Sequence, residues 1–221
     1  MSAVAHIDQY KTGLFYSDEF RGDFSWNGYE HNVLLRNEGP GAEGTVRFTD
    51  VALALGADDS HDARAVAVAD FDNDGDLDLA INNNAGDPTR GTQVGPVLLR
   101  NEIGTRRSWL AVELRGTQSN RDGVGALVRL EAGGVEQVRH LSAGSAYASQ
   151  QSGRLYFGLD EAGEVERLAV RWPSGREETF EDIGARQLVR ITEGSGLQEL
   201  ALPKLQTGML TTKKEAGGDR L

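Results

Sequence analysis

Short runs of alternating apolar and polar residues recur along the chain, and glycine-containing turns separate them. Residues 109–114 alternate in this way, as do residues 165–170. A period of two places successive side chains on opposite faces and is typical of half-buried β-strands. The pattern predicts strands at 33–36, 65–69, 77–81, 97–100, 109–115, 126–131, 135–141, 154–157, 165–172 and 187–191. Only 50–56 and a few residues around Asp182 indicate short helical turns, so the sequence predicts an all-β fold.

The turns between these strands also carry recognisable signals. Gly133-Gly134 separates two predicted strands and is typical of a β-hairpin. Pro173-Ser174-Gly175 follows another strand and predicts a turn with proline at its second position. Glycine accounts for 28 of the 221 residues and proline for only 5. This balance favours tight turns between short strands.

One hexapeptide occurs twice. The sequence from Val33 to Glu38 returns from Val97 to Glu102, an offset of 64 residues that suits a long blade of a β-propeller. The repeat ends near residue 105, where a half rich in hairpins begins. The predicted parts are an aromatic and acidic N-terminal segment (1–30), a propeller-type repeat (31–105), a β-domain (106–195) and a partly disordered tail (196–221).

Charge and composition exclude several classes of partner. Lysine and arginine number 23 against 34 aspartates and glutamates, giving a net charge of −11. Nucleic acids and anionic membranes attract clustered positive charge, so neither is an expected partner. The longest apolar run, 51–57, is too short to insert into a membrane. The chain has no cysteine, which excludes disulfides, thiolate metal sites and thiol nucleophiles.

The stretch from Asp70 to Asp78 is the most informative part of the chain. Carboxylates occupy its positions 1, 3, 5, 7 and 9, and glycine occupies position 6, where a sharp turn is needed. Calcium takes six to eight oxygen ligands, which alternate residues of a curled loop can supply. We predict a Ca²⁺ site in this loop, whose residues are Asp70, Asp72, Asp74, Asp76 and Asp78.

The loop differs from an EF-hand, because position 12 is Ile81 rather than glutamate and strands flank it. The side chains of Asp70, Asp72, Asp74 and Asp78 are the expected ligands. Asp76 is expected to contribute its backbone carbonyl and to point its side chain outwards. The alternatives are a solvated acidic turn without a metal, and magnesium, which prefers compact octahedral sites.

The acidic loop and several other stretches of the sequence resemble known protein families. Residues 68–82, with the flanking 33–37 and 47–51, resemble the FG-GAP/VCBS repeats of integrin-like β-propellers. Residues 116–126, 142–150, 155–159 and 170–175 resemble the ASPIC/UnbV domain, in the order of that family. The combination is similar to bacterial relatives of cartilage acidic protein. The resemblance implies a partial integrin-like propeller followed by a small β-sandwich-like domain, in a secreted or surface protein without established catalytic residues.

The resemblance leaves the propeller incomplete. Blades bury their faces against one another, and residues 1–105 supply one blade and part of a second. We therefore expect either a fragment of a longer protein or a small subunit that another chain completes. No signal peptide is visible at the start, although the family implies an extracellular, periplasmic or cell-surface location.

Three aromatic residues are candidates for ligand binding. Trp26 and Tyr29 lie in an aromatic cluster that either binds a partner or packs against a neighbouring blade. Trp172 is either a core residue or a platform for stacking a sugar. No catalytic residue is predicted, because no nucleophilic motif is present and aspartates that hold a cation are not free to transfer protons.

The sequence therefore supports a calcium-binding, non-enzymatic interaction or adhesion module that binds a protein or a glycan. The alternative is an accessory or structural subunit of a larger, enzymatic complex in which a larger chain completes the propeller. A calcium-dependent hydrolase is a third hypothesis, and the sequence offers it no nucleophile or acid/base pair.

Overall fold

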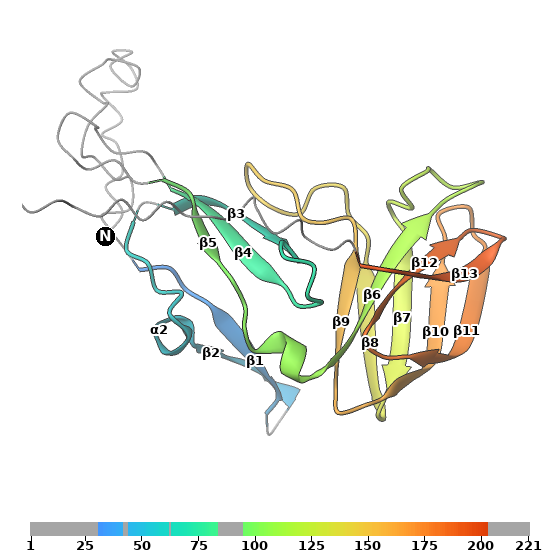
Figure 1. Cartoon of the computed structure of the whole chain (residues 1–221), viewed down its shortest axis with the longest axis horizontal. Helices are drawn as coiled ribbons and strands as arrows, with labels where there is room; N and C mark the ends of the chain where they lie inside the picture. Colours follow the sequence, from blue (N-terminus) through green and yellow to red (C-terminus); the bar gives the residue numbers. More distant parts are fainter. Residues whose placement is uncertain (1–30, 42–43, 62, 84–94, 203–221) are drawn as a thin grey trace, which may run out of the picture. The chain divides into compact units, whose positions relative to one another are not determined.

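The computed structural model describes residues 31–41, 44–61, 63–83 and 95–202, and their strands form four sheets (Figure 1). The chain divides into two compact units. The N-terminal unit contains the described residues up to 69, 77–102 and 140–153. The C-terminal unit contains residues 70–76, 103–139 and the described residues from 154 onwards. The prediction of an all-β fold is confirmed.

The N-terminal unit contains two small antiparallel sheets. A hairpin pairs β1 (Leu35–Pro40) with β2 (Val46–Asp50). A three-stranded sheet has the order β3 (Ala63–Ala69), β4 (Asp78–Asn83), β5 (Val97–Leu99). The single turn of α2 (Ala52–Leu55) lies within the segment predicted to be helical, and it ends at Gly56 in the left-handed conformation, with φ of 71°.

Few apolar side chains of the N-terminal unit are buried. Among its described residues these are Ala52, Ala57, Ile81 and Leu141. Seven larger apolar or aromatic residues are instead more than half exposed: Val33, Leu35, Val46, Phe48, Leu53, Leu55 and Tyr147. Exposed apolar surface on this scale is unusual for a monomeric protein.

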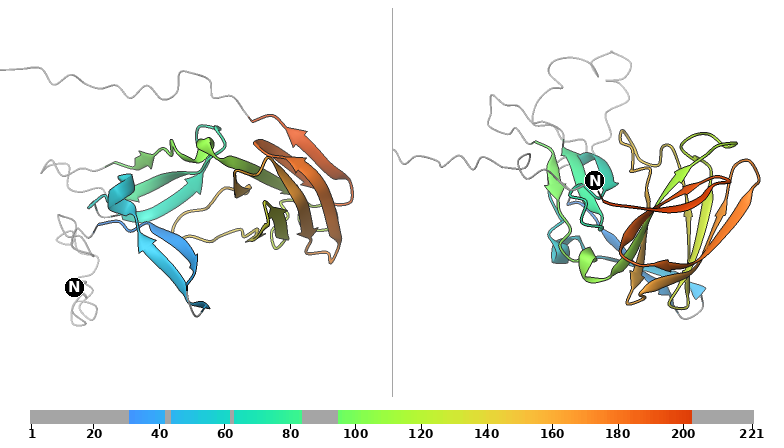
Figure 2. Two further views of the ribbon diagram at one scale, coloured as in Figure 1. Left: turned by 90° about the horizontal axis from the view of Figure 1, so that it is seen from below. Right: turned by 45° about the vertical axis from the view of Figure 1, so that its right-hand side comes forward.

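The C-terminal unit is a sandwich of two four-stranded sheets (Figure 2). A one-turn 3₁₀ helix, η5 (Gly104–Arg106), precedes its first strand. One sheet has the order β11 (Glu177–Gly184), β10 (Glu164–Arg171), β7 (Leu127–Ala132), β8 (Val135–His140). The other has the order β13 (Gly196–Leu200), β12 (Gln187–Thr192), β6 (Ser108–Arg115), β9 (Leu155–Asp160).

The core of this unit follows the alternation of strands such as β7 and β9, whereas the central strand β6 is buried on both faces over residues 109–112. Leu110 and Val112 of β6 are fully buried, as are Phe157 of β9 and Leu168 of β10. The predicted turns lie where expected: the hairpin at Gly133-Gly134 joins β7 to β8, and Gly175 donates its N–H to the Trp172 carbonyl at 2.9 Å.

Several elements differ from the prediction. The strands β2, β11 and β13 were not predicted, and the expected helical turn at Asp182 is wrong because this residue lies within β11. Asp182 has a φ of 55°, which interrupts the alternation of the strand. The strand β13 lies beyond the expected domain limit at residue 195 and pairs with β12. Residues 203–221 of the expected tail lie outside the described residues.

A buried carboxylate joins three loops of the C-terminal unit. Glu193 follows β12, and only 1% of its surface is exposed. Its Oε2 accepts the backbone N–H groups of Thr117, Gln118 and Ser119 at 2.7–2.8 Å. Its Oε1 accepts the hydroxyl of Ser119 at 2.9 Å and that of Ser174.

Burial alone would raise the pKa of Glu193. The hydroxyl of Ser174 and the N–H groups of residues 117–119 outweigh burial, because they bond the ionised form, and they lower the pKa from 4.5 to about 2. The ionised carboxylate therefore stabilises the folded state, and this stabilisation decreases as the pH falls from 4.5 towards 2.

We expect Glu193→Gln to lower the free energy of unfolding by about 3 kcal/mol at pH 7, because hydrogen bonds to a buried charge are lost. The folded-state pKa is lowered, so the stabilisation by Glu193 is complete above about pH 4.5 and is lost as the pH falls towards 2. Urea unfolding at pH 7 and at pH 3 measures both effects. The exposed Glu199→Gln is the control. An equal loss at both pH values would contradict this account of Glu193.

Candidate metal centre

The acidic loop leads from the end of β3 to the start of β4, which are paired at Ala69 and Asp78. It brings together three of the predicted ligands. Asp70, Asp72 and Asp78 each offer a carboxylate oxygen, and the three oxygens lie within 4.8 Å of one another. Asp70 is 8% exposed and Asp78 is 1% exposed. A set of oxygen donors at this spacing fits a hard divalent cation.

Backbone N–H groups hold the loop in its curled form. The two carboxylate oxygens of Asp70 accept the N–H groups of Asp74 and Gly75, each at 3.1 Å. Gly75 has a φ of 102°, and Asn73 is also left-handed with a φ of 58°. Asp78 accepts the N–H of Asn101 at 2.8 Å, which ties the start of β4 to the second copy of the hexapeptide.

Crowding negative carboxylates into the loop is electrostatically unfavourable, as the pKa of Asp70 indicates. Burial raises the pKa of Asp70, the N–H groups of Gly75 and Asp74 lower it, and the negative charge of Asp74 raises it again. The net direction is upwards, so the protein alone does not fully stabilise the ionised form. A cation placed among these oxygens would supply the missing opposite charge.

The other two predicted ligands make different contacts. Asp74 is exposed, and its carboxylate accepts the N–H of Asp76 at 3.1 Å. Asp76 is buried, and its carboxylate accepts the N–H of Thr105 at 3.1 Å. The expected outward orientation of the Asp76 side chain is therefore wrong, because this side chain bonds to the backbone before β6 instead of facing solvent.

Two aromatic residues that the sequence did not single out support residues 70–76. The hydroxyl of Tyr156 on β9 donates to Asp70 at 3.3 Å. The ring of Trp109 on β6 lies against Gly75 so closely that a Cβ at this position would be 2.1 Å from the indole. Glycine is required here both for its backbone conformation and for its missing side chain. In the sequence, the alternation of residues 109–114 was the only indication that Trp109 is buried.

Of the three aromatic residues predicted to bind a ligand, the structure describes Trp172 alone. Trp26 and Tyr29 lie outside the described residues. Trp172 is 2% exposed, and its indole N–H donates to Glu178 at 2.7 Å. This is the placement of a core residue with a satisfied polar group, and it leaves no ring face free for stacking a sugar.

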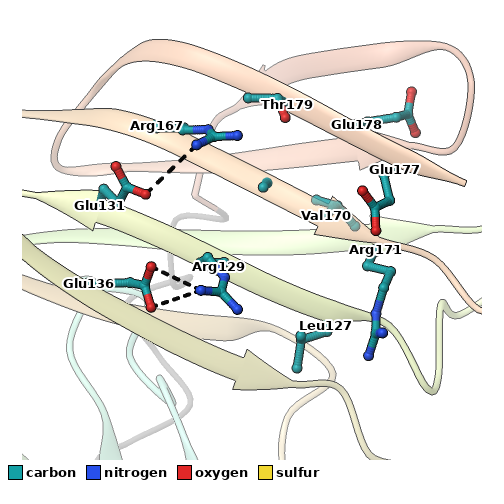
Figure 3. A pocket seen from close by; sticks show the side chains of 11 residues that line it. Leu127, Arg129, Glu131, Glu136, Arg167, Val170, Arg171, Glu177, Glu178 and Thr179 are labelled. Carbon is teal, nitrogen blue, oxygen red and sulfur yellow. Dashed lines mark hydrogen bonds and ion pairs between the residues drawn. The ribbon is translucent and has the colours of Figure 1, made fainter.

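A polar groove of about 600 Å³ crosses the outer face of the sheet β11-β10-β7-β8 (Figure 3). Arg129 bonds Glu136 through both carboxylate oxygens at 3.0 Å, and Arg167 pairs with Glu131 at 4.0 Å. Opposite charges that pair with one another on an exposed sheet face contribute to solubility and little to stability. Among the described residues, no helix is long and apolar enough to cross a membrane.

Two protein families match separate regions of the chain. Residues 21–81 match the FG-GAP-like repeat family. Residues 116–198 match the ASPIC and UnbV family. No curated protein matches the chain. These two matches confirm the predicted resemblance to the FG-GAP and ASPIC/UnbV families.

We expect Gly75→Ala to destabilise the protein by about 3 kcal/mol, because the new methyl group would collide with Trp109. The matched control is Gly134→Ala, which has a similar left-handed backbone with φ of 75° and open space around it. This control should cost only about 1 kcal/mol of backbone strain. Urea unfolding of both variants measures the difference, and equal losses would contradict the close packing of Gly75 on Trp109.

Proposed function

Because the chain carries an FG-GAP-like repeat and an ASPIC/UnbV domain, we propose that it is a calcium-binding, non-enzymatic interaction module. The observation that carries the proposal is the convergence of the Asp70, Asp72 and Asp78 carboxylates. Both domain types are generally non-catalytic. The exposed apolar surface of the N-terminal unit further supports a role in binding.

Calcium fits the donor set better than softer metals do. All of the candidate ligands offer oxygen, and the chain lacks the cysteines that softer metals prefer. The side chains of Asp70, Asp72 and Asp78 would hold the ion, with Asp74 and the backbone of Asp76 as further ligands. The bound ion would neutralise repulsion in the loop and fix the pairing of β3 with β4.

The proposed location is outside the cytoplasm, at the cell surface or in an extracellular or periplasmic space. Proteins with FG-GAP repeats are commonly found there. Extracellular calcium is abundant enough to fill even a weak site. In this role the ion adds stability only to the folded form, by an amount that rises with its concentration.

A second candidate function is that of an accessory or structural subunit whose propeller a larger protein chain completes. The exposed apolar side chains of β1, β2 and α2 favour it, because blades of a propeller bury such surfaces against their neighbours. Phe48 on β2 is 57% exposed and Leu53 on α2 is 80% exposed. A glycan remains the other proposed ligand of the module.

We expect calcium titration by isothermal calorimetry to give one site whose occupation raises the melting temperature. Asp72→Asn should weaken the affinity at least about tenfold, because one carboxylate ligand loses its charge. Asp122→Asn changes an exposed aspartate of another loop and should leave the affinity unchanged. Equal binding by both variants would place the ion elsewhere, and no binding by the unmodified protein would refute the calcium proposal.

Native mass spectrometry of the protein purified from its own source tests the subunit role. We expect a complex with a larger chain that weakens when calcium is chelated. Phe48→Glu should abolish the complex, because it places a charge in the apolar surface. Val138→Glu, at an exposed apolar residue of β8, is the control and should preserve it. A lone 23.9 kDa species would favour the self-sufficient module.

A further inference from the structure

The two copies of the repeated hexapeptide have different neighbours in the N-terminal unit. The first copy, residues 33–38, leads into β1, which pairs with β2. The second copy, residues 97–102, opens with β5, which pairs with β4 (Figure 1). Among the residues that the structure describes, no strand pairs with the other edge of β5, because the sheet ends there in the order β3-β4-β5. The same sequence is thus paired on a different edge in each copy.

The two copies share a local contact as well as their sequence. In the first copy, Nη2 of Arg36 lies 2.8 Å from Oε1 of Glu38. In the second copy, Arg100 and Glu102 pair through the same two atoms. A repeated sequence with a repeated contact indicates the same local conformation. The pairing of β1 with β2 is therefore a template for a strand next to β5.

The first copy shows which backbone groups face such a strand. The carbonyl of Leu34 accepts the N–H of Val51, the residue after β2, at 2.8 Å. The N–H of Leu34 donates to the carboxylate of Asp50 at 3.2 Å. Both backbone groups of Leu34 are therefore bonded on the β2 side.

The equivalent of Leu34 in the second copy is Leu98, which lies at the centre of β5. The backbone groups of successive residues in a strand are directed at opposite edges. On the template of Leu34, the N–H and carbonyl of Leu98 face the open edge, and those of Val97 and Leu99 face β4. An edge that presents backbone groups in this way is ready to pair with a further strand.

The repeat position that would supply this strand is used elsewhere in the chain. Residues 110–114 follow β2 at the offset of the hexapeptide, and they belong to β6. Both edges of β6 are occupied, one by β9 and the other by β12. The sheet β3-β4-β5 also has one strand fewer than the four of a typical propeller blade. A strand from another chain would complete it.

We propose that β5 accepts a strand from the partner chain and that this strand has the chemistry of β2. It would run antiparallel to β5 and donate an N–H to the carbonyl of Leu98, as Val51 does to Leu34. An aspartate one residue earlier would accept the N–H of Leu98, as Asp50 accepts that of Leu34. Main-chain bonds supply the affinity in this mode of recognition. The proposal rests on the subunit role proposed above.

A peptide of residues 44–52 of this chain is the probe, because it carries the β2 sequence together with Asp50 and Val51. We expect the labelled peptide to bind the full-length protein, as measured by fluorescence anisotropy. Leu98→Pro should weaken binding at least about tenfold, because proline removes the N–H at the open edge. Proline is tolerated in edge strands, so the fold should survive. Leu98→Ala keeps the backbone groups and is the matched control, which should still bind.

Changes to the peptide test the same bonds without altering the protein. N-methylation at Val51 removes the N–H that pairs with Leu98 and should weaken binding at least about tenfold. N-methylation at Asp50 changes an N–H that alternation directs away from this edge, so binding should persist. Equal effects of the two methyl groups would overturn the proposal.

Three other outcomes would also overturn the proposal. Failure of the peptide to bind the unmodified protein would mean that the edge of β5 is closed. Loss of binding in Leu34→Pro but not in Leu98→Pro would mean that the peptide replaces β2 beside β1. Dimers of the protein that the peptide dissociates would identify a second copy as the occupant.

The subunit role and the added strand can fail separately. Native mass spectrometry of Leu98→Pro, beside Phe48→Glu, distinguishes them. If Phe48→Glu abolishes the complex with the larger chain and Leu98→Pro preserves it, the subunit role stands and strand addition at β5 is refuted. Loss of the complex in both variants supports both proposals.

Discussion

The carboxylate of Glu193 is the interaction on which the C-terminal unit depends. It accepts three consecutive backbone N–H groups and two hydroxyls, and these donors come from the loop after β6 and from the turn after β10. One side chain thereby fixes loops from both sheets of the sandwich at a common point. A buried charge is costly unless it is fully bonded, and full bonding makes this site specific for a carboxylate of this length.

The N-terminal unit is organised by a different principle. It has little apolar core among its described residues, and backbone pairing joins β1 to β2 and β4 to both β3 and β5. Isolated two-stranded hairpins are only marginally stable in water. A neighbouring blade, as proposed above, would supply the apolar contacts that such a unit lacks.

Much of this could be predicted from local sequence. The alternation of residues 165–170 gave β10, and the spacing of the aspartates placed Asp70, Asp72 and Asp78 around one point. What sequence could not predict depends on contacts between distant residues. Asp76 bonds to Thr105 through tertiary packing, and β13 lacks alternation because Gln198 and Glu199 are adjacent. Glu193 looked like an ordinary polar residue after a strand, since its backbone donors lie more than seventy positions away.

The parallel pairing of β12 with β6 has a consequence for how the chain folds. Gln187 pairs with Leu110, so the centre of this sheet closes only after nearly the whole domain is available. Contacts of such long sequence separation slow folding, because chain entropy is lost before they form. During synthesis, β6 leaves the ribosome long before its parallel partner and carries an unpaired edge meanwhile. We expect this domain to fold late and as one unit, and to rely on chaperones until β12 has emerged.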